Sequence, residues 1–219
     1  MNQLLLDIAP DWWPTFENFV PGENSELLFA LHEALSGEAT ERCLYVWGAA
    51  GSGKSHLLQA VVGAAQNAHQ NAVYARGYVP EYADIVAVDD VDSLDEAAQI
   101  ELFNLYNQVR DCGAMLLVSG AQSPLHLKVR ADLRTRLGWG LVYQVQGLGD
   151  EQKLQALDRH AKDRGFALSP EILQYLLRHG RRDLPSLLKV IDALDEHTLS
   201  LHRAPSIPLL KEVMQLEEK

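Results

Sequence analysis

Residues 48–55 read Gly-Ala-Ala-Gly-Ser-Gly-Lys-Ser and fit the pattern G-x-x-x-x-G-K-[S/T]. A short apolar run over 43–47 precedes this motif, and a run with helical character begins at His56. The context predicts a loop whose backbone N–H groups face a phosphate chain, with Lys54 at the outer phosphates and the Ser55 hydroxyl on Mg²⁺. A glycine-rich turn without a nucleotide is the alternative. We assign the nucleotide contacts of this loop to Gly48, Ala50, Gly51, Ser52, Gly53, Lys54, Ser55 and His56.

The composition is that of an acidic globular protein, with 219 residues, 47% hydrophobic residues and a net charge of −11. No apolar run approaches the roughly 20 residues of a membrane span, and no secretory signal is evident, so we expect a cytoplasmic protein without a membrane partner. The acidic balance disfavours general nucleic-acid binding, and contact with DNA is expected to be indirect. The two cysteines and eight histidines lack the spacing of a metal site.

A second stretch with chemical potential is Ile85-Val-Ala-Val-Asp89-Asp90, an apolar run that ends in two carboxylates. Ligands of parallel sheets bind at the carboxyl ends of the strands, so we expect Asp89 to hold Mg²⁺ together with Ser55, and Asp90 to orient an attacking water. A solvated acidic turn is the alternative, and an EF-hand lacks its required glycine. Ser119 ends another apolar run and is either a sensor of the γ-phosphate or a turn residue.

Short apolar runs alternate with helical patterns, which predicts an α/β fold with a mostly parallel five-stranded sheet flanked by helices. The pattern becomes all-helical after Gly147, so we expect a tail over 1–14, a nucleotide-binding domain over 15–148 and a helical lid over 149–219. The second and third strands are separated only by 77–83, so they are not expected to form a standard β-α-β pair. The expected strands are 43–47, 71–76, 84–89, 114–119 and 140–145.

Two arginines are candidates for phosphate contact, and three residues are candidates for helix caps. Arg136 lies on an expected short helix before the fifth strand, and Arg182 lies at the start of a lid helix. A guanidinium suits phosphate contact because it is planar and always charged; a surface salt bridge for Arg136 and a solvated loop cation for Arg182 are the alternatives. Asn24, Ser169 and Asp183 are expected to cap the helices that follow them.

These motifs together resemble the AAA+ family and, within it, the bacterial DnaA-type replication initiators. The stretch TFENFVPG over residues 15–22 resembles the base-binding segment of that group. The resemblance therefore implies that Phe19 and Val20 contact the nucleotide, which would be ADP or ATP with Mg²⁺. It covers residues 15–219.

Two further motifs carry the same resemblance. LRTRLGWG over residues 133–140 resembles the arginine-finger motif of the initiators, with Arg136 at the finger position. RRDLPSLL over residues 181–188 resembles their lid motif and implies that Arg182 is the lid arginine known as sensor II.

The first residues resemble the peptide with which proteins dock on the bacterial sliding clamp, which implies clamp contacts by Gln3, Leu4, Leu6 and Ile8. On the residues alone, the same stretch is equally a strand added to the sheet. The chain ends after the expected lid, where initiators continue into a helix-turn-helix domain. This combination resembles the regulatory inactivators of DnaA, which bind the clamp and promote hydrolysis of ATP on DnaA.

The resemblance implies that Arg136 acts on ATP bound to a DnaA-type initiator, with the sliding clamp as second partner. Hydrolysis by the chain itself is expected to be weak or absent, because a phosphate loop indicates binding rather than turnover. The residues after Ser119 also lack an acidic side chain that initiators commonly carry. Two alternatives stay open: an autonomous DnaA-like ATPase, acting as a homo-oligomer, and a clamp-tethered adaptor with a structural nucleotide.

Overall fold

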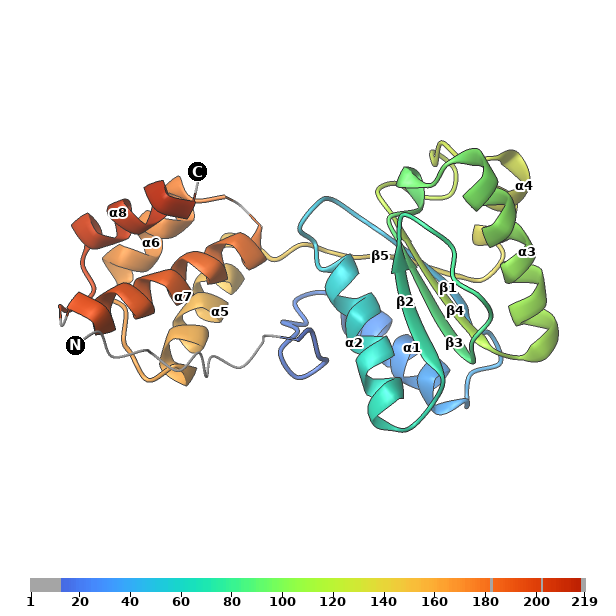
Figure 1. Cartoon of the computed structure of the whole chain (residues 1–219), viewed down its shortest axis with the longest axis horizontal. Helices are drawn as coiled ribbons and strands as arrows, with labels where there is room; N and C mark the ends of the chain where they lie inside the picture. Colours follow the sequence, from blue (N-terminus) through green and yellow to red (C-terminus); the bar gives the residue numbers. More distant parts are fainter. Residues whose placement is uncertain (1–12, 182, 202, 218–219) are drawn as a thin grey trace, which may run out of the picture.

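The computed structural model describes residues 13–181, 183–201 and 203–217. A parallel sheet carries helices on both faces, and a bundle of helices lies beside it (Figure 1). The strands are β1 (Cys43–Trp47), β2 (Ala72–Arg76), β3 (Ile85–Asp89), β4 (Met115–Gly120) and β5 (Leu141–Gln144). The helices are α1 (Ser25–Ser36), α2 (Lys54–Asn67), the 3₁₀ turn η1 (Val91–Ser93), α3 (Glu96–Cys112), α4 (Ala131–Leu137), α5 (Asp150–Asp163), α6 (Pro170–His179), α7 (Leu184–Leu201) and α8 (Ile207–Glu217).

The strand order is β2-β3-β4-β1-β5, and every neighbouring pair is parallel. Strands β3 and β4 are buried along their whole length because helices cover both faces of the sheet. The predicted α/β fold with five parallel strands is confirmed, and β1 and β3 deliver the two predicted motifs to one end of the sheet.

The short link between β2 and β3 joins two parallel neighbouring strands, which was not expected. The two strands are parallel neighbours, with Ala72 opposite Ile85 and Arg76 opposite Asp89, yet no helix joins them. A five-residue strand spans about 16 Å, whereas an extended link over 77–84 reaches about 26 Å, so the chain can return without a helix. The expectation that this is not a standard β-α-β pair is correct, although the strands do pair in parallel.

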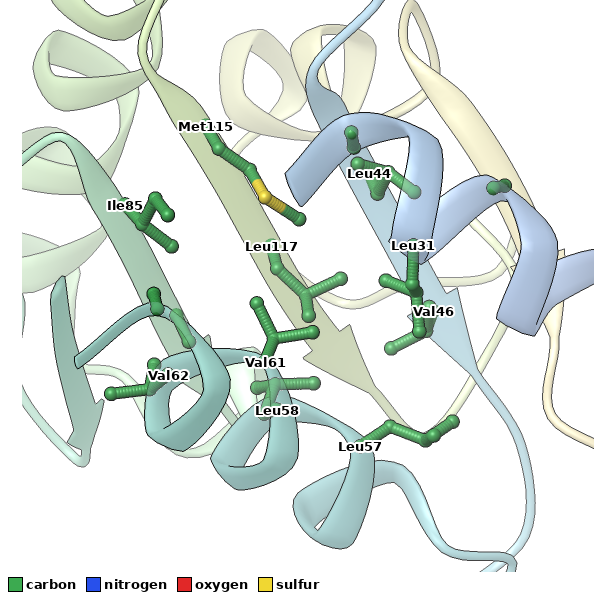
Figure 2. Close-up of a cluster of buried hydrophobic side chains, with 14 of the residues drawn as sticks. Leu31, Leu44, Val46, Leu57, Leu58, Val61, Val62, Ile85, Met115 and Leu117 are labelled. Atoms are coloured by element: carbon green, nitrogen blue, oxygen red, sulfur yellow. The ribbon is translucent and has the colours of Figure 1, made fainter. Parts of the chain in front are cut away.

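Two hydrophobic cores hold the helices to the sheet. Figure 2 shows one of them, in which Leu57, Leu58 and Val61 of α2 face side chains of the central strands, including Leu117. The second core joins α3 and α4 to the opposite face through residues such as Leu102. Figure 1 accordingly shows α1 and α2 on one side of the sheet and α3 and α4 on the other.

Helices α5 to α8 enclose a separate core that includes Leu157, Leu176 and Leu210. The predicted cap at the start of α7 is present, because the Ser186 N–H donates to Asp183 Oδ1 at 3.0 Å. Ser169 occupies the predicted N-cap position before Pro170 without making the side-chain capping bond. Within the described part of the chain, no helix combines the length and apolar character needed to cross a bilayer.

Candidate functional site

The loop over 48–55 joins β1 to α2, and its glycines are required by its backbone path. Gly53 has φ +105° directly before α2, and a β-carbon there would lie 2.8 Å from Phe19 Cε2. Gly51 has φ +75°, and a β-carbon at Gly48 would lie 2.6 Å from the Val145 carbonyl oxygen. Only glycine fits at these three positions, and the path of the loop brings backbone N–H groups and the N-terminus of α2 to one place.

Two polar groups of the loop are suited to an anion. The Ser52 hydroxyl is buried and has no hydrogen-bond partner among the described residues. The Lys54 ammonium donates to the carbonyl oxygens of Gly48 and Ala49 at 2.8 and 2.9 Å, so it lies back over the loop. Burial lowers the Lys54 pKa, and the nearby carboxylates, Asp89 first among them, oppose that shift. A phosphate chain would satisfy both groups, so these residues fit a nucleotide.

The two carboxylates at the end of β3 are held by the chain's own side chains. Asp89 is buried; it accepts a hydrogen bond from the Tyr74 hydroxyl at 2.8 Å and another from the Ser119 hydroxyl. Asp90 adopts a left-handed conformation with φ +61° and forms an ion pair with Arg76 at 3.2 Å. Strand β2 thus supplies a partner to each of the two carboxylates.

Ser119 is fully buried at the end of β4, next to these carboxylates. Its hydroxyl donates to Asp89 and accepts the Asp90 backbone N–H at 2.9 Å. The structure therefore gives Ser119 a role in shaping the turn after β3. Its contact with a γ-phosphate stays a prediction.

The segment before α1 is fixed against the loop by Phe19 and His56. Phe19 packs on Gly53 and on the His56 ring, with ring centroids 5.4 Å apart. The His56 ring donates a hydrogen bond from Nε2 to the Thr15 carbonyl oxygen at 2.9 Å, and burial lowers the His56 pKa. Phe19 and Val20 consequently border the loop, where the sequence expects nucleotide contacts.

A cleft lies where this segment, the loop and the helical bundle meet. Asp183 lies beside the cleft, because it packs closely on Gly51: a β-carbon on Gly51 would approach Asp183 Cβ to 2.7 Å. Such a junction can report the state of a bound ligand to the bundle. The residues that line the cleft are Phe19, Val20, Gly51, Ser52, Gly53, Gln146, Leu148, Lys153, Leu184 and Pro185.

Asn24 has a different role from the predicted helix cap. Its side chain makes no capping bond to α1. Instead, its amide nitrogen donates to the carbonyl oxygens of Pro21 and Gln146, and its amide oxygen accepts the Gln146 N–H at 2.7 Å. Asn24 is buried, so these bonds tie the segment before α1 to the chain that leaves β5 for the bundle.

Arg136 lies on α4, on the face of the sheet opposite α2 (Figure 1). Its guanidinium carbon lies 3.9 Å from the centroid of the Trp139 ring and 5.4 Å from that of Phe103. The structure brings Lys54, Asp89 and Asp90 to one end of the sheet and leaves Arg136 apart from them.

Some predicted site residues lie outside the described residues, and the expected Mg²⁺ has no site built from protein ligands alone among the described residues. Among the described residues, no three or more His, Cys, Asp or Glu side chains gather in a way that could hold a metal. The expected Mg²⁺ ligands Ser55 and Asp89 would share the ion with phosphate oxygens. The predicted site residues that lie outside the described residues are Gln3, Leu4, Leu6, Ile8 and Arg182.

Comparison with known families gives two matches that divide the chain. A family model described as the bacterial DnaA ATPase domain matches residues 12–80 and 69–144. A second model, described as the lid domain of Hda, matches residues 150–214. The two matches meet between β5 and α5, so the sheet and the bundle each have their own family relationship.

Solved structures share the fold. Domain III of the replication initiation protein DnaA from Thermotoga maritima has a TM-score of 0.75 at 23% identity, covering 92% of this chain and 95% of that one. AMPPCP-bound DnaA from Aquifex aeolicus has a TM-score of 0.71 at 24% identity, covering 83% of this chain and 65% of that one. The Thermotoga maritima RuvB branch-migration motor has a TM-score of 0.68 at 16% identity, covering 93% of this chain and 72% of that one. The chain thus has an AAA+ fold and spans about two thirds of the Aquifex initiator.

Proposed function

Because the chain belongs to the DnaA-like AAA+ family, we propose that it is a nucleotide-bound regulator that stimulates ATP hydrolysis on a DnaA-type initiator. The match of its bundle to the Hda lid supports a regulatory rather than an initiating role. The observation that carries the proposal is the position of Arg136, on the face of the sheet opposite α2. An arginine placed there serves a second protein's nucleotide.

The nucleotide of this chain is ADP or ATP, held by the loop over 48–55. Backbone N–H groups, Lys54 and the buried Ser52 hydroxyl bind the phosphates, and Phe19 and Val20 border the base. The AMPPCP-bound neighbour supports a nucleotide in this fold. Mg²⁺, bound by Ser55 and Asp89, would neutralise phosphate charge. A nucleotide held here would lie between the loop and the bundle, and Arg182 is the proposed lid contact.

Hydrolysis by the chain alone is slow. The carboxylate of Asp90, the proposed water-orienting group, is paired with Arg76, and both oxygens of Asp89 already accept hydrogen bonds from hydroxyls. This ion pair occupies Asp90 Oδ2 and therefore competes with its contact to an attacking water. The site is therefore built to retain a nucleotide, which then acts as a structural ligand.

Arg136 supplies the catalytic charge to the partner. ATP hydrolysis spreads negative charge over the oxygens of the transferring phosphoryl group, and an inserted guanidinium offsets that charge. Arginine fingers of this kind typically contribute about 10³–10⁵ in rate. The ATP, the Mg²⁺ and the attacking water belong to the initiator.

The sliding clamp is the second proposed partner, bound by Gln3, Leu4, Leu6 and Ile8 in the cytoplasm. A chain with net charge −11 has little general attraction to DNA, so the clamp brings it to DNA indirectly. Changing Gln3 and Leu6 to Ala is expected to abolish retention on immobilised clamp. Full retention would remove the clamp from the proposal.

The test of the proposal compares Arg136→Ala with Arg134→Ala in an assay of initiator-bound ATP. Arg134 lies on the same helix and is exposed, which makes it a matched control for loss of charge. Arg136→Ala is expected to lose at least about 10³-fold of the stimulation while nucleotide and clamp binding persist. Arg134→Ala should stimulate normally. Equal stimulation by both variants would contradict the proposal, and rapid turnover by the chain alone would favour an autonomous ATPase.

A further inference from the structure

Two arginines share one exposed indole at the end of α4. Arg136 lies over Trp139 with its guanidinium carbon 3.9 Å from the ring centroid, and the Arg110 guanidinium carbon lies 5.4 Å from the same centroid. Phe103 flanks Arg136 at 5.4 Å. The Trp139 side chain is 54% exposed, so this ring is a surface feature despite its size.

The backbone holds Trp139 in a fixed place. Its N–H donates to the Arg136 carbonyl oxygen at 3.0 Å, which closes a turn and brings the two side chains together. Leu137 before it is buried in the core, and a β-carbon on Gly140 after it would lie 2.1 Å from the Cys43 carbonyl oxygen. The backbone of Trp139 is therefore fixed between two anchored positions.

The charge of Arg136 has no acidic partner in the part of the chain that the structure describes. Within the described residues, neither Arg136 nor Arg110 forms an ion pair, and Arg136 Nε is buried without a hydrogen-bond acceptor. By contrast, Arg130, one residue before α4, pairs with both Glu96 and Asp132. Aromatic faces attract a guanidinium without occupying its in-plane N–H donors.

We infer that Trp139 is a positioning residue that holds Arg136 ready for a phosphate, and that Arg110 completes an anion-receiving surface on the same ring. The inference rests on the proposed function, because the ligand is a triphosphate held by a second protein. An acidic partner at this position would occupy the donors that the phosphate needs, whereas the indole orders the side chain and leaves its terminal N–H donors available.

The experiment measures hydrolysis of initiator-bound ATP at increasing concentrations of Trp139→Leu and Trp139→Phe. Trp139→Leu is expected to lower the maximal rate about two- to five-fold, equivalent to one exposed cation–π contact, with little change in the half-saturating concentration. Trp139→Phe keeps an aromatic face and should recover part of that rate. Phe29→Leu, which removes another exposed aromatic ring, is the control and should act as wild type. A full rate with Trp139→Leu overturns the inference.

A second measurement needs no partner. The indole N–H resonance lost in Trp139→Leu identifies Trp139 by nuclear magnetic resonance, and Arg136→Ala should shift that resonance while the others stay in place. An unmoved Trp139 resonance overturns the stacking. Arg110 is exposed, so Arg110→Ala should fold normally and lower the stimulated rate at least two-fold; an unchanged rate removes Arg110 from the surface.

These outcomes separate the two proposals. If Arg136→Ala leaves stimulation intact, the proposed function fails and this inference fails with it. If Arg136→Ala abolishes stimulation while Trp139→Leu does not reduce it, only the positioning role of Trp139 fails.

Discussion

Replacing Asn24 by Ala tests whether the segment before α1 is fastened to the chain that leads from β5 to the bundle. The Asn24 amide donates to the Pro21 and Gln146 carbonyl oxygens at 3.0 and 2.9 Å and accepts the Gln146 N–H at 2.7 Å. Each such bond contributes about 0.5–1.5 kcal/mol, and the side chain is buried. Asn24→Ala is therefore expected to lower the free energy of unfolding by about 2–4 kcal/mol.

Urea unfolding measures this loss, with Glu23→Ala as the control. Glu23 is exposed, so its substitution should change stability by no more than about 0.5 kcal/mol. Amide hydrogen exchange supplies a local measurement, because the Gln146 N–H should exchange faster in Asn24→Ala once its acceptor is removed. A loss below about 0.5 kcal/mol, or unchanged protection of Gln146, would refute the reasoning.

Three further substitutions test the phosphate loop and the helix that follows it. Gly53→Ala should cost about 1–2 kcal/mol and weaken nucleotide binding in calorimetry, because φ is +105° and the new β-carbon meets Phe19. Gly63→Ala, which adds a β-carbon in open space within α2, should instead stabilise the fold by about 0.5–1 kcal/mol. Similar effects from both would contradict the assigned loop geometry. Burial lowers the His56 pKa, so the stability due to its neutral ring is present above about pH 6.5 and is lost as the pH falls through its folded-state pKa. In urea titrations, His56→Gln should lower the free energy of unfolding less at pH 5.5 than at pH 7.5. An equal loss at the two pH values would contradict this contribution.

The parts of the fold that follow from local pattern could be predicted. The spacing of Gly48, Gly53 and Lys54 requires a strand before the loop and a helix after it, and the structure has both. The apolar run that ends at Asp89 is a strand buried on both faces. The change to helices α5 to α8 is also visible in the sequence, because their apolar residues recur with helical spacing.

Long-range contacts could not be predicted, because no local pattern encodes them. Asn24 precedes a helix and resembles a cap, but its partner Gln146 lies 122 residues away. The pairing of Tyr74 with Asp89 and of Arg76 with Asp90 depends on β2 lying beside β3, which the short link did not reveal. The contact between Trp139 and Arg136 could have been predicted from the sequence, because the two residues are three positions apart, the separation of a closed turn.

The central claim is that Arg136 acts on ATP held by another protein. The direct measurement follows hydrolysis of ATP bound to a DnaA-type initiator, with clamp loaded on DNA, in the presence and absence of this chain. The account predicts rapid hydrolysis only when initiator, loaded clamp and wild-type chain are together, and a return to the unstimulated rate with Arg136→Ala. Hydrolysis that is equally fast without the chain, or with Arg136→Ala in its place, would contradict the account.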